Sequence, residues 1–75
     1  MAFRRYIVRN GSEEAWLTNI SIDKGVVIYR YMPDAGIAMK IDTIHEARKI
    51  AEECHGRVQI LKMNRNGEAY GEDVK

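Results

Sequence analysis

Cysteine, proline and long hydrophobic runs are scarce in this chain of 75 residues, which contains one cysteine and one proline. A single cysteine cannot form an internal disulfide, and no cluster of cysteine and histidine in the sequence indicates a structural metal site. The lone thiol is typical of a reducing compartment, so we expect a cytoplasmic protein. No run is apolar enough for a signal peptide or a transmembrane span, so we expect no membrane association.

Net charge is also nearly absent, because 12 lysines and arginines face 11 aspartates and glutamates, for a formal charge of +1. This balance argues against a dedicated nucleic-acid-binding protein or a polybasic membrane anchor. The length predicts a single domain over residues 1–70 with a flexible tail over residues 71–75. A domain of this size buries only about 60% of the surface of its unfolded chain. Small domains without disulfides or metals often depend on a partner subunit for stability.

One amphipathic helix is predicted in the middle of the chain. Thr43 and Glu46 form the pattern of a capping box, and Asp42 is a second candidate for the N-cap. Gly56 is expected to end the helix as its left-handed C′ residue. Apolar residues recur at spacings of three and four and define the buried face of the helix: Ile44, Ala47, Ile50, Ala51 and Cys54.

Alternating and β-branched residues predict strands on both sides of this helix. The expected strands cover residues 3–9, 15–20, 26–31, 37–41 and 57–63, with an optional edge strand at 68–70. Asn10-Gly11 is a strong signal for a hairpin turn between the first two strands. The predicted fold class is therefore α+β, an antiparallel sheet of four to six strands with one helix packed on one face, in the order ββββ-α-β(β).

The first two strands carry apolar residues on both of their faces. One face is expected to hold Tyr6, Val8, Ala15 and Leu17. The other face is expected to hold Phe3, Ile7, Trp16 and Ile20. A sheet covered by one helix should have one face in water, so the apolar residues of the second face predict an open binding surface.

Residues 15–63 combine features that follow a tyrosine-rich first strand: a Leu-Thr-Asn stretch and a strand–helix–strand pattern. That pattern comprises Ala38, Lys40, Ile41, Asp42, Thr43, Glu46, Ala47, Ala51, Gly56 and Val58. In these features the chain resembles small uncharacterised proteins of phages and prophages. Ile41 stands where that group usually has an aromatic residue, and His45 stands where it often has an acid. The general plan is also similar to that of small phage-encoded inhibitors of bacterial defence systems. The resemblance implies no catalytic residue.

No constellation of residues in the sequence predicts an enzyme or a cofactor site. Cys54 and His55 are neighbours, and adjacent residues of a helix point about 100° apart, so they do not form a nucleophile–base pair. Cys54 is expected to be a small core residue. The carboxylate pairs are sequence neighbours on turns, on the outer helix face and in the tail, so we interpret them as solvated side chains.

Arginines interleaved with aromatic residues are the main candidates for binding. The candidate interface or nucleic-acid-binding residues are Arg5, Ile7, Arg9, Trp16, Tyr29, Arg30 and Tyr31. Such residues are enriched in protein interfaces, they can stack bases and contact phosphates, and they also suit ordinary strands. The sequence favours a non-enzymatic, phage-type accessory protein that binds itself as a homodimer or binds and inhibits a host protein. The alternative is a weak, sequence-tolerant nucleic-acid-binding domain.

Overall fold

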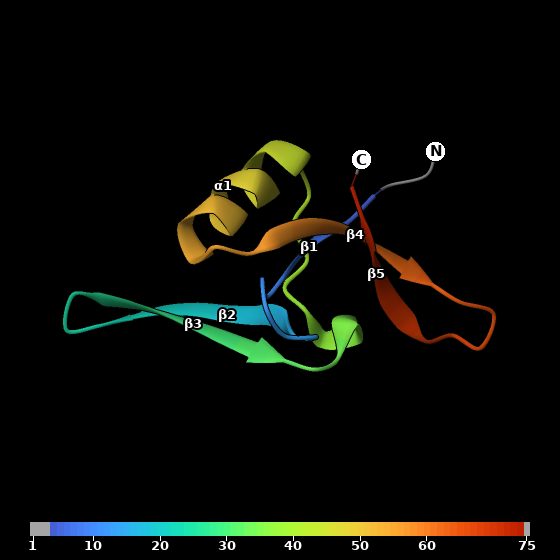
Figure 1. Cartoon of the computed structure of the whole chain (residues 1–75), viewed down its shortest axis with the longest axis horizontal. Coiled ribbons are helices and arrows are strands. Elements are labelled where there is room, and N and C mark those ends of the chain that lie inside the picture. Colours follow the sequence, from blue (N-terminus) through green and yellow to red (C-terminus); the bar gives the residue numbers. More distant parts are fainter. Residues whose placement is uncertain (1–3, 75) are drawn as a thin grey trace.

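The computed structural model describes residues 4–74, which form a five-stranded sheet with an α-helix above one face (Figure 1). The elements in chain order are β1 (Tyr6–Arg9), β2 (Trp16–Asp23), β3 (Val26–Met32), the 3₁₀ turn η1 (Ala35–Ile37), α1 (Ile44–Cys54), β4 (Arg57–Met63) and β5 (Ala69–Asp73). The strand order is β3-β2-β1-β4-β5, and every neighbouring pair is antiparallel. The predicted α+β class and antiparallel sheet are confirmed.

The strand predicted over residues 37–41 is wrong. This segment holds the end of η1 and an extended stretch whose β-bridge joins Ile41 to Tyr6. The side chain of Asp34 accepts a hydrogen bond from the Gly36 N–H at 2.8 Å and so starts the 3₁₀ turn. A side chain that satisfies a local N–H offers the backbone an alternative to strand pairing. The described order is therefore βββ-η-α-ββ.

Residues 39–41 pass through the sheet between β1 and β2. The register between these two strands covers Arg9 and Trp16, at the end of β1. Further along, Tyr6 and Ile41 exchange two backbone hydrogen bonds of 2.8 Å, and the Met39 N–H donates to a carbonyl of β2 at 2.9 Å. The chain thereby carries η1 to one face of the sheet and α1 to the other.

The helix begins as predicted and ends differently. Thr43 is the N-cap, and its hydroxyl oxygen accepts a hydrogen bond from the Glu46 N–H at 3.2 Å. The left-handed residue at the end is His55 (φ 58°, ψ 33°), so the prediction for Gly56 is wrong. Gly56 is required for another reason: a Cβ there would lie 2.6 Å from the carbonyl oxygen of Arg9. The glycine lets the helix end approach β1.

β1 and β2 form a hairpin as predicted, and the connection between them is a loop over residues 10–15. The side-chain oxygen of Asn10 accepts hydrogen bonds from the N–H groups of Ser12 and Glu13, at 2.9 and 3.2 Å. The Asn10 N–H donates to the Ala15 carbonyl at 2.8 Å and closes the loop. Asn10 therefore organises a wider turn through its side chain.

Two apolar clusters lie on opposite faces of the sheet. We call the face below α1 the helix face and the other the reverse face. The buried residues of the helix-face cluster are Val8, Leu17, Ile41, Ala47 and Ala51. The buried residues of the reverse-face cluster are Ile7, Trp16, Ala35 and Ala38. The largest completely buried side chains, Ile7, Val8 and Leu17, come from both clusters. Both faces of the central sheet are therefore covered by the chain itself.

A β-bulge in β2 changes which residues reach each face. Leu17 lies opposite Tyr31 and Asn19 lies opposite Arg30, so Thr18 is an additional residue in β2. An extra residue shifts the alternation by one position. Ile20 consequently packs against the helix-face cluster, and its predicted place on the reverse face is wrong.

The last hairpin is longer than predicted. β4 is followed by a turn in which Gly67 has a φ of 80°. The Gly67 N–H donates a hydrogen bond to the Asn64 carbonyl at 3.1 Å. The optional strand at residues 68–70 is β5, which continues to Asp73. Residues 71–73, which the sequence assigned to a flexible tail, therefore pair with β4.

Candidate interaction surface

The sheet separates the seven candidate binding residues instead of gathering them. Tyr29 and Tyr31 pack against the helix-face cluster. By the strand register, Arg9 and Arg30 point to the reverse face. Arg5 is exposed and forms an ion pair with Asp42 on the way into α1. No single face of the sheet therefore combines the tyrosines with these strand arginines.

Trp16 and Ile7 do not form the open surface that the sequence predicted. Ile7 is 0% exposed and Trp16 is 8% exposed. Ala35 in η1 and Ala38 just after it cover them, and Leu61 and Ala69 pack against the same cluster. Phe3, the other residue expected there, lies outside the described residues. The first two strands carry apolar residues on both faces because α1 covers one face of the sheet and the segment of Ala35 and Ala38 covers the other.

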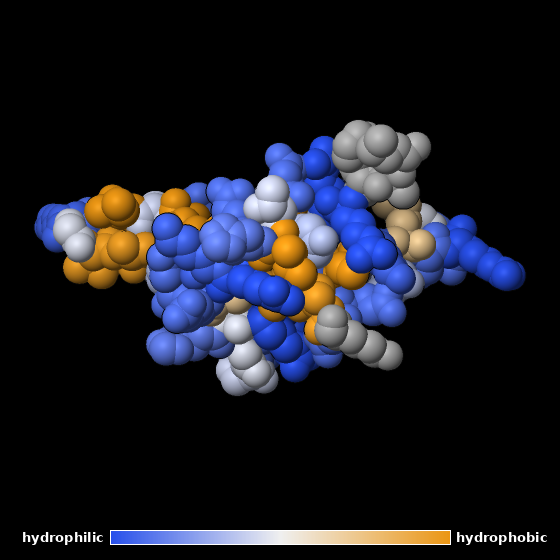
Figure 2. All heavy atoms as spheres, turned by 90° about the horizontal axis from the view of Figure 1, so that it is seen from above, coloured by the Kyte–Doolittle hydropathy of each residue, from blue (hydrophilic) through white to orange (hydrophobic). Residues whose placement is uncertain are grey.

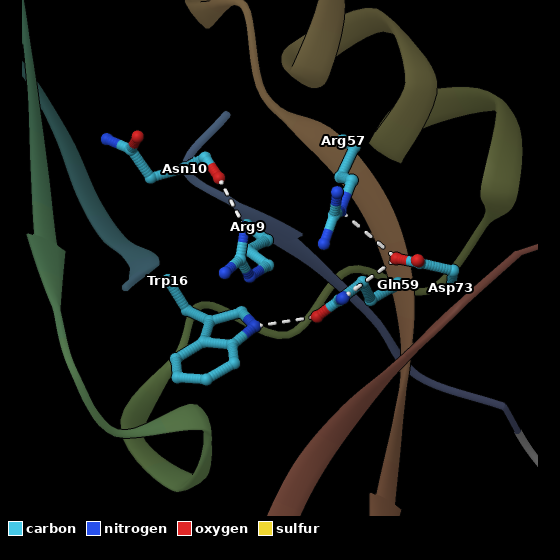
Figure 3. Close-up of polar contacts among 6 residues, drawn as sticks. All are labelled: Arg9, Asn10, Trp16, Arg57, Gln59 and Asp73. Carbon is cyan, nitrogen blue, oxygen red and sulfur yellow. Dashed lines mark hydrogen bonds and ion pairs between the residues drawn. The ribbon is translucent and has the colours of Figure 1, made fainter. Parts of the chain in front are cut away.

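A chain of hydrogen bonds fixes Trp16 within this cover (Figure 3). The indole N–H donates to the side-chain oxygen of Gln59 at 2.8 Å, and the Gln59 amide donates to Asp73 at 2.9 Å. Asp73 also pairs with Arg57 at 3.1 Å. Gly71 makes room for this chain, because a Cβ there would lie 2.0 Å from the Gln59 oxygen. The indole N–H is already used and is not offered to a ligand.

Tyr29 and Tyr31 pack within the protein on the helix face and interact with its neighbouring side chains. Burial, followed by the hydrogen bond and electrostatic interaction with Cys54 and the electrostatic effect of Tyr29, raises the pKa of Tyr31 to about 12. Cys54 is partly buried in the same cluster, and its S–H points to the Ala51 carbonyl at 3.9 Å. This placement agrees with the interpretation of Cys54 as a core residue.

The largest apolar exposure in the described chain lies elsewhere, on the hairpin of β2 and β3. We call its outer half, residues 20–29, the arm. Ile22 is 73% exposed, Val26 is 62% exposed and Val27 is 45% exposed. Figure 2 shows hydrophobic side chains gathered at the end of the molecule where Figure 1 places this hairpin. The helix packs mainly on β1 and β4, and the outer part of the arm at Ile22, Val26 and Val27 stays exposed.

No protein-family model, curated protein or solved structure matches this chain. Fold and function therefore rest on the chain's own geometry.

The described residues contain few other candidates for a site. Residues 4–74 enclose no detectable pocket, and no group of three or more metal-ligating side chains comes together among them. None of the helices in this part of the chain is long and apolar enough to cross a membrane. The sequence did hold a signal for the arm: aliphatic residues on both faces of two strands joined by the tight turn at Lys24 and Gly25.

Proposed function

We propose that this chain is a non-enzymatic protein-binding module that acts in the cytoplasm and associates through the arm. The supporting observation is the cluster of exposed aliphatic side chains at Ile22, Val26 and Val27. Removing such a side chain from water contributes roughly 1.5–3 kcal/mol for complete burial. Ile22 and Val27 lie opposite each other and share one face of the arm, and Val26 lies on the other face. In a domain with so small a core, exposed aliphatic side chains on both faces of one hairpin favour a role in binding.

The position of the arm supports this role. The molecule extends 43 Å along its longest axis against 24 and 20 Å along the others. The arm projects along that axis and beyond α1 (Figure 1). A projecting hairpin can reach a partner without disturbing the two covered faces of the sheet. The resemblance to phage proteins gives a hypothesis for the setting, in which the partner is a host protein or a second copy of the chain.

Sedimentation equilibrium of the purified chain from micromolar to millimolar concentration tests the proposal. We expect the mass to rise with concentration, and the double variant Ile22→Ser/Val27→Ser to weaken association roughly tenfold or more. Met63→Ser is the matched control, because Met63 is 68% exposed on β4 at a distance from the arm in the fold. A chain that stays monomeric throughout and also retains no host protein in a pull-down would contradict the proposal, as would equal effects of the arm variant and Met63→Ser.

The alternative of nucleic-acid binding has less support. Base stacking with phosphate contacts needs aromatic and basic side chains on one surface. Tyr29 and Tyr31 pack on the helix face, whereas Arg9 and Arg30 belong to the reverse face, where Trp16 is buried. A gel shift at low salt that weakens steeply between about 50 and 200 mM salt would favour the alternative.

A further inference from the structure

The two edge strands of the sheet differ in how well their side chains protect them from pairing with another chain. β3 is an edge strand of seven residues, Val26–Met32, and Arg30 is its only charged residue. β5, the opposite edge, carries Glu72 and Asp73. Glu72 pairs with Lys62 and raises the pKa of that lysine. Charges commonly protect edge strands from pairing with other chains. The β5 edge has this protection, and the β3 edge largely lacks it.

The unpaired backbone groups on β3 can be assigned to alternate residues. Lys24 (φ 51°) and Gly25 (φ 81°) form a two-residue turn with the positive φ angles of type I′. Asp23 and Val26, which flank this turn, are therefore a hydrogen-bonded pair, in which the backbone N–H and C=O groups of each residue point to the other strand. Backbone groups alternate in direction along an antiparallel strand. Val26, Ile28 and Arg30 therefore face β2.

A separate contact supports this assignment. The Thr18 hydroxyl, on β2, donates to the Arg30 carbonyl at 3.2 Å, which places that carbonyl on the β2 side. The N–H and C=O groups of Val27, Tyr29 and Tyr31 consequently point to the free edge. The edge offers three residues whose backbone groups can pair with another strand.

Resting on the proposed function of the arm, we propose that its partner is a second copy of this chain. The two β3 strands pair antiparallel, edge to edge, about a two-fold axis that passes through Tyr29. The result is one continuous sheet of ten strands across the dimer. α1 packs mainly on β1 and β4, and β3 forms an outer edge of the sheet.

The alternation of backbone groups restricts the possible registers. The free backbone groups of one β3 strand can pair with those of the other only if the two-fold axis passes through a residue and not between two residues. The residues near the middle of β3 that could lie on this axis are Ile28, Tyr29 and Arg30. An axis at Arg30 would place two guanidinium groups directly opposite each other, which is destabilising. An axis at Ile28 would set Met32 against the turn residue Lys24.

An axis at Tyr29 overlaps all seven residues of β3. Val27 then lies opposite Tyr31 of the second copy, and Val26 lies opposite Met32, so these apolar side chains face apolar side chains. Ile28 lies opposite Arg30, which keeps the two Arg30 guanidinium groups apart. The same axis brings Lys24 to the level of Asp34 of the second copy, which gives two symmetric contacts of opposite charge. Self-complementarity of this kind is what a two-fold interface requires.

Single cysteines along β3 test the register. Cys54 is first replaced by alanine, since it is the chain's only cysteine. In this background Tyr29→Cys places two thiols at the axis, where paired Cα atoms lie about 5.5 Å apart, within the range for a disulfide. In Ile28→Cys or Arg30→Cys the two equivalent Cα atoms lie roughly 8 Å apart, beyond that range.

We expect mild oxidation to cross-link Tyr29→Cys at least tenfold faster than either of the other two variants. Because Tyr29→Cys can also weaken the fold, a second measurement leaves Tyr29 in place. A mixture of Ile28→Cys and Arg30→Cys chains should cross-link efficiently, although neither variant does so alone, since these positions lie opposite each other across the axis.

Fastest cross-linking of Ile28→Cys or Arg30→Cys alone, or equal rates at all three positions with no gain in the mixture, would overturn this register. Sedimentation of the wild type and of Ile22→Ser/Val27→Ser separates the two proposals. Association that depends on the arm but shows no position-specific cross-linking would remove this inference and leave the proposed function standing. A wild type that is monomeric throughout would remove this inference, and it would remove the proposed function as well if the chain also retains no host protein in a pull-down.

Discussion

Gly71→Ala should destabilise the fold although alanine suits a strand better than glycine. The new Cβ would lie 2.0 Å from the side-chain oxygen of Gln59 and 3.1 Å from the indole nitrogen of Trp16. Gln59 would have to leave its position, because the shorter distance is far inside van der Waals contact. Its hydrogen bonds to Trp16 and Asp73 would both be lost.

The expected size of the effect follows from these contacts. A buried indole N–H without a partner costs about 1–3 kcal/mol. Replacing a strand glycine with alanine by itself stabilises the fold by roughly 0.5–1 kcal/mol, because the unfolded chain then has less conformational entropy to lose. The net loss is about 1–2 kcal/mol, a sizeable part of the roughly 4–11 kcal/mol expected for a domain of this length.

Urea unfolding at one fixed protein concentration measures this change, with Trp16 as the only fluorescent tryptophan. Gln59→Ala provides the comparison background, since it removes the atoms with which the new Cβ collides. In that background Gly71→Ala should be neutral or slightly stabilising once the indole shifts by a few tenths of an ångström. An equal loss of stability in both backgrounds would show that the collision with Gln59 is not the cause.

Three further predictions concern the helix and the helix face. Thr43→Ala should lower the free energy of unfolding by about 1 kcal/mol through loss of the N-cap, measured by urea unfolding followed by circular dichroism. Gly56→Ala should cost more than Thr43→Ala in the same assay, because its Cβ meets the rigid backbone carbonyl of Arg9 at 2.6 Å; an equal or smaller cost would contradict the packing described. Burial raises the pKa of Tyr31 above that of the unfolded chain, so its contribution to stability should be complete below pH 10 and lost as the pH rises towards 12. Absorbance at high pH should show one late-titrating tyrosine, and Tyr31→Phe should remove it.

Local patterns predicted the helix and most of the strands. The Thr43 N-cap of α1 is confirmed, because its hydroxyl accepts a hydrogen bond from an N–H only three residues along the chain. β3 and β4 follow from short runs of alternating or β-branched residues next to glycine-containing turns. Such signals depend on neighbours in the sequence and are independent of the tertiary fold.

Long-range features were not predictable in the same way. The bulge at Thr18 is defined by the pairing of β2 with β3, and β2 contains no residue type that predicts a bulge from the sequence. Residues 35–38 were expected to include part of a strand, because nothing local shows that Ala35 and Ala38 cover Ile7 and Trp16. The candidate surface was therefore placed on a face that the chain itself covers.

The arm could have been inferred from lengths. β2 has eight residues, which at about 3.3 Å each span roughly 26 Å, whereas the 11 residues of α1 span only about 16 Å. One helix of that length cannot cover the whole of such a hairpin as well as the centre of the sheet. The aliphatic residues near Lys24 and Gly25 were thus the ones most in need of a partner.

Amide hydrogen exchange along β3, measured at low and high protein concentration, tests the proposed dimer most directly. In the proposed dimer the N–H groups of Val27, Tyr29 and Tyr31 should become protected as concentration rises, while those of Ile28 and Arg30 keep the same protection throughout. Exchange at Val27, Tyr29 and Tyr31 that is independent of concentration, or protection that rises uniformly along the strand, would contradict it.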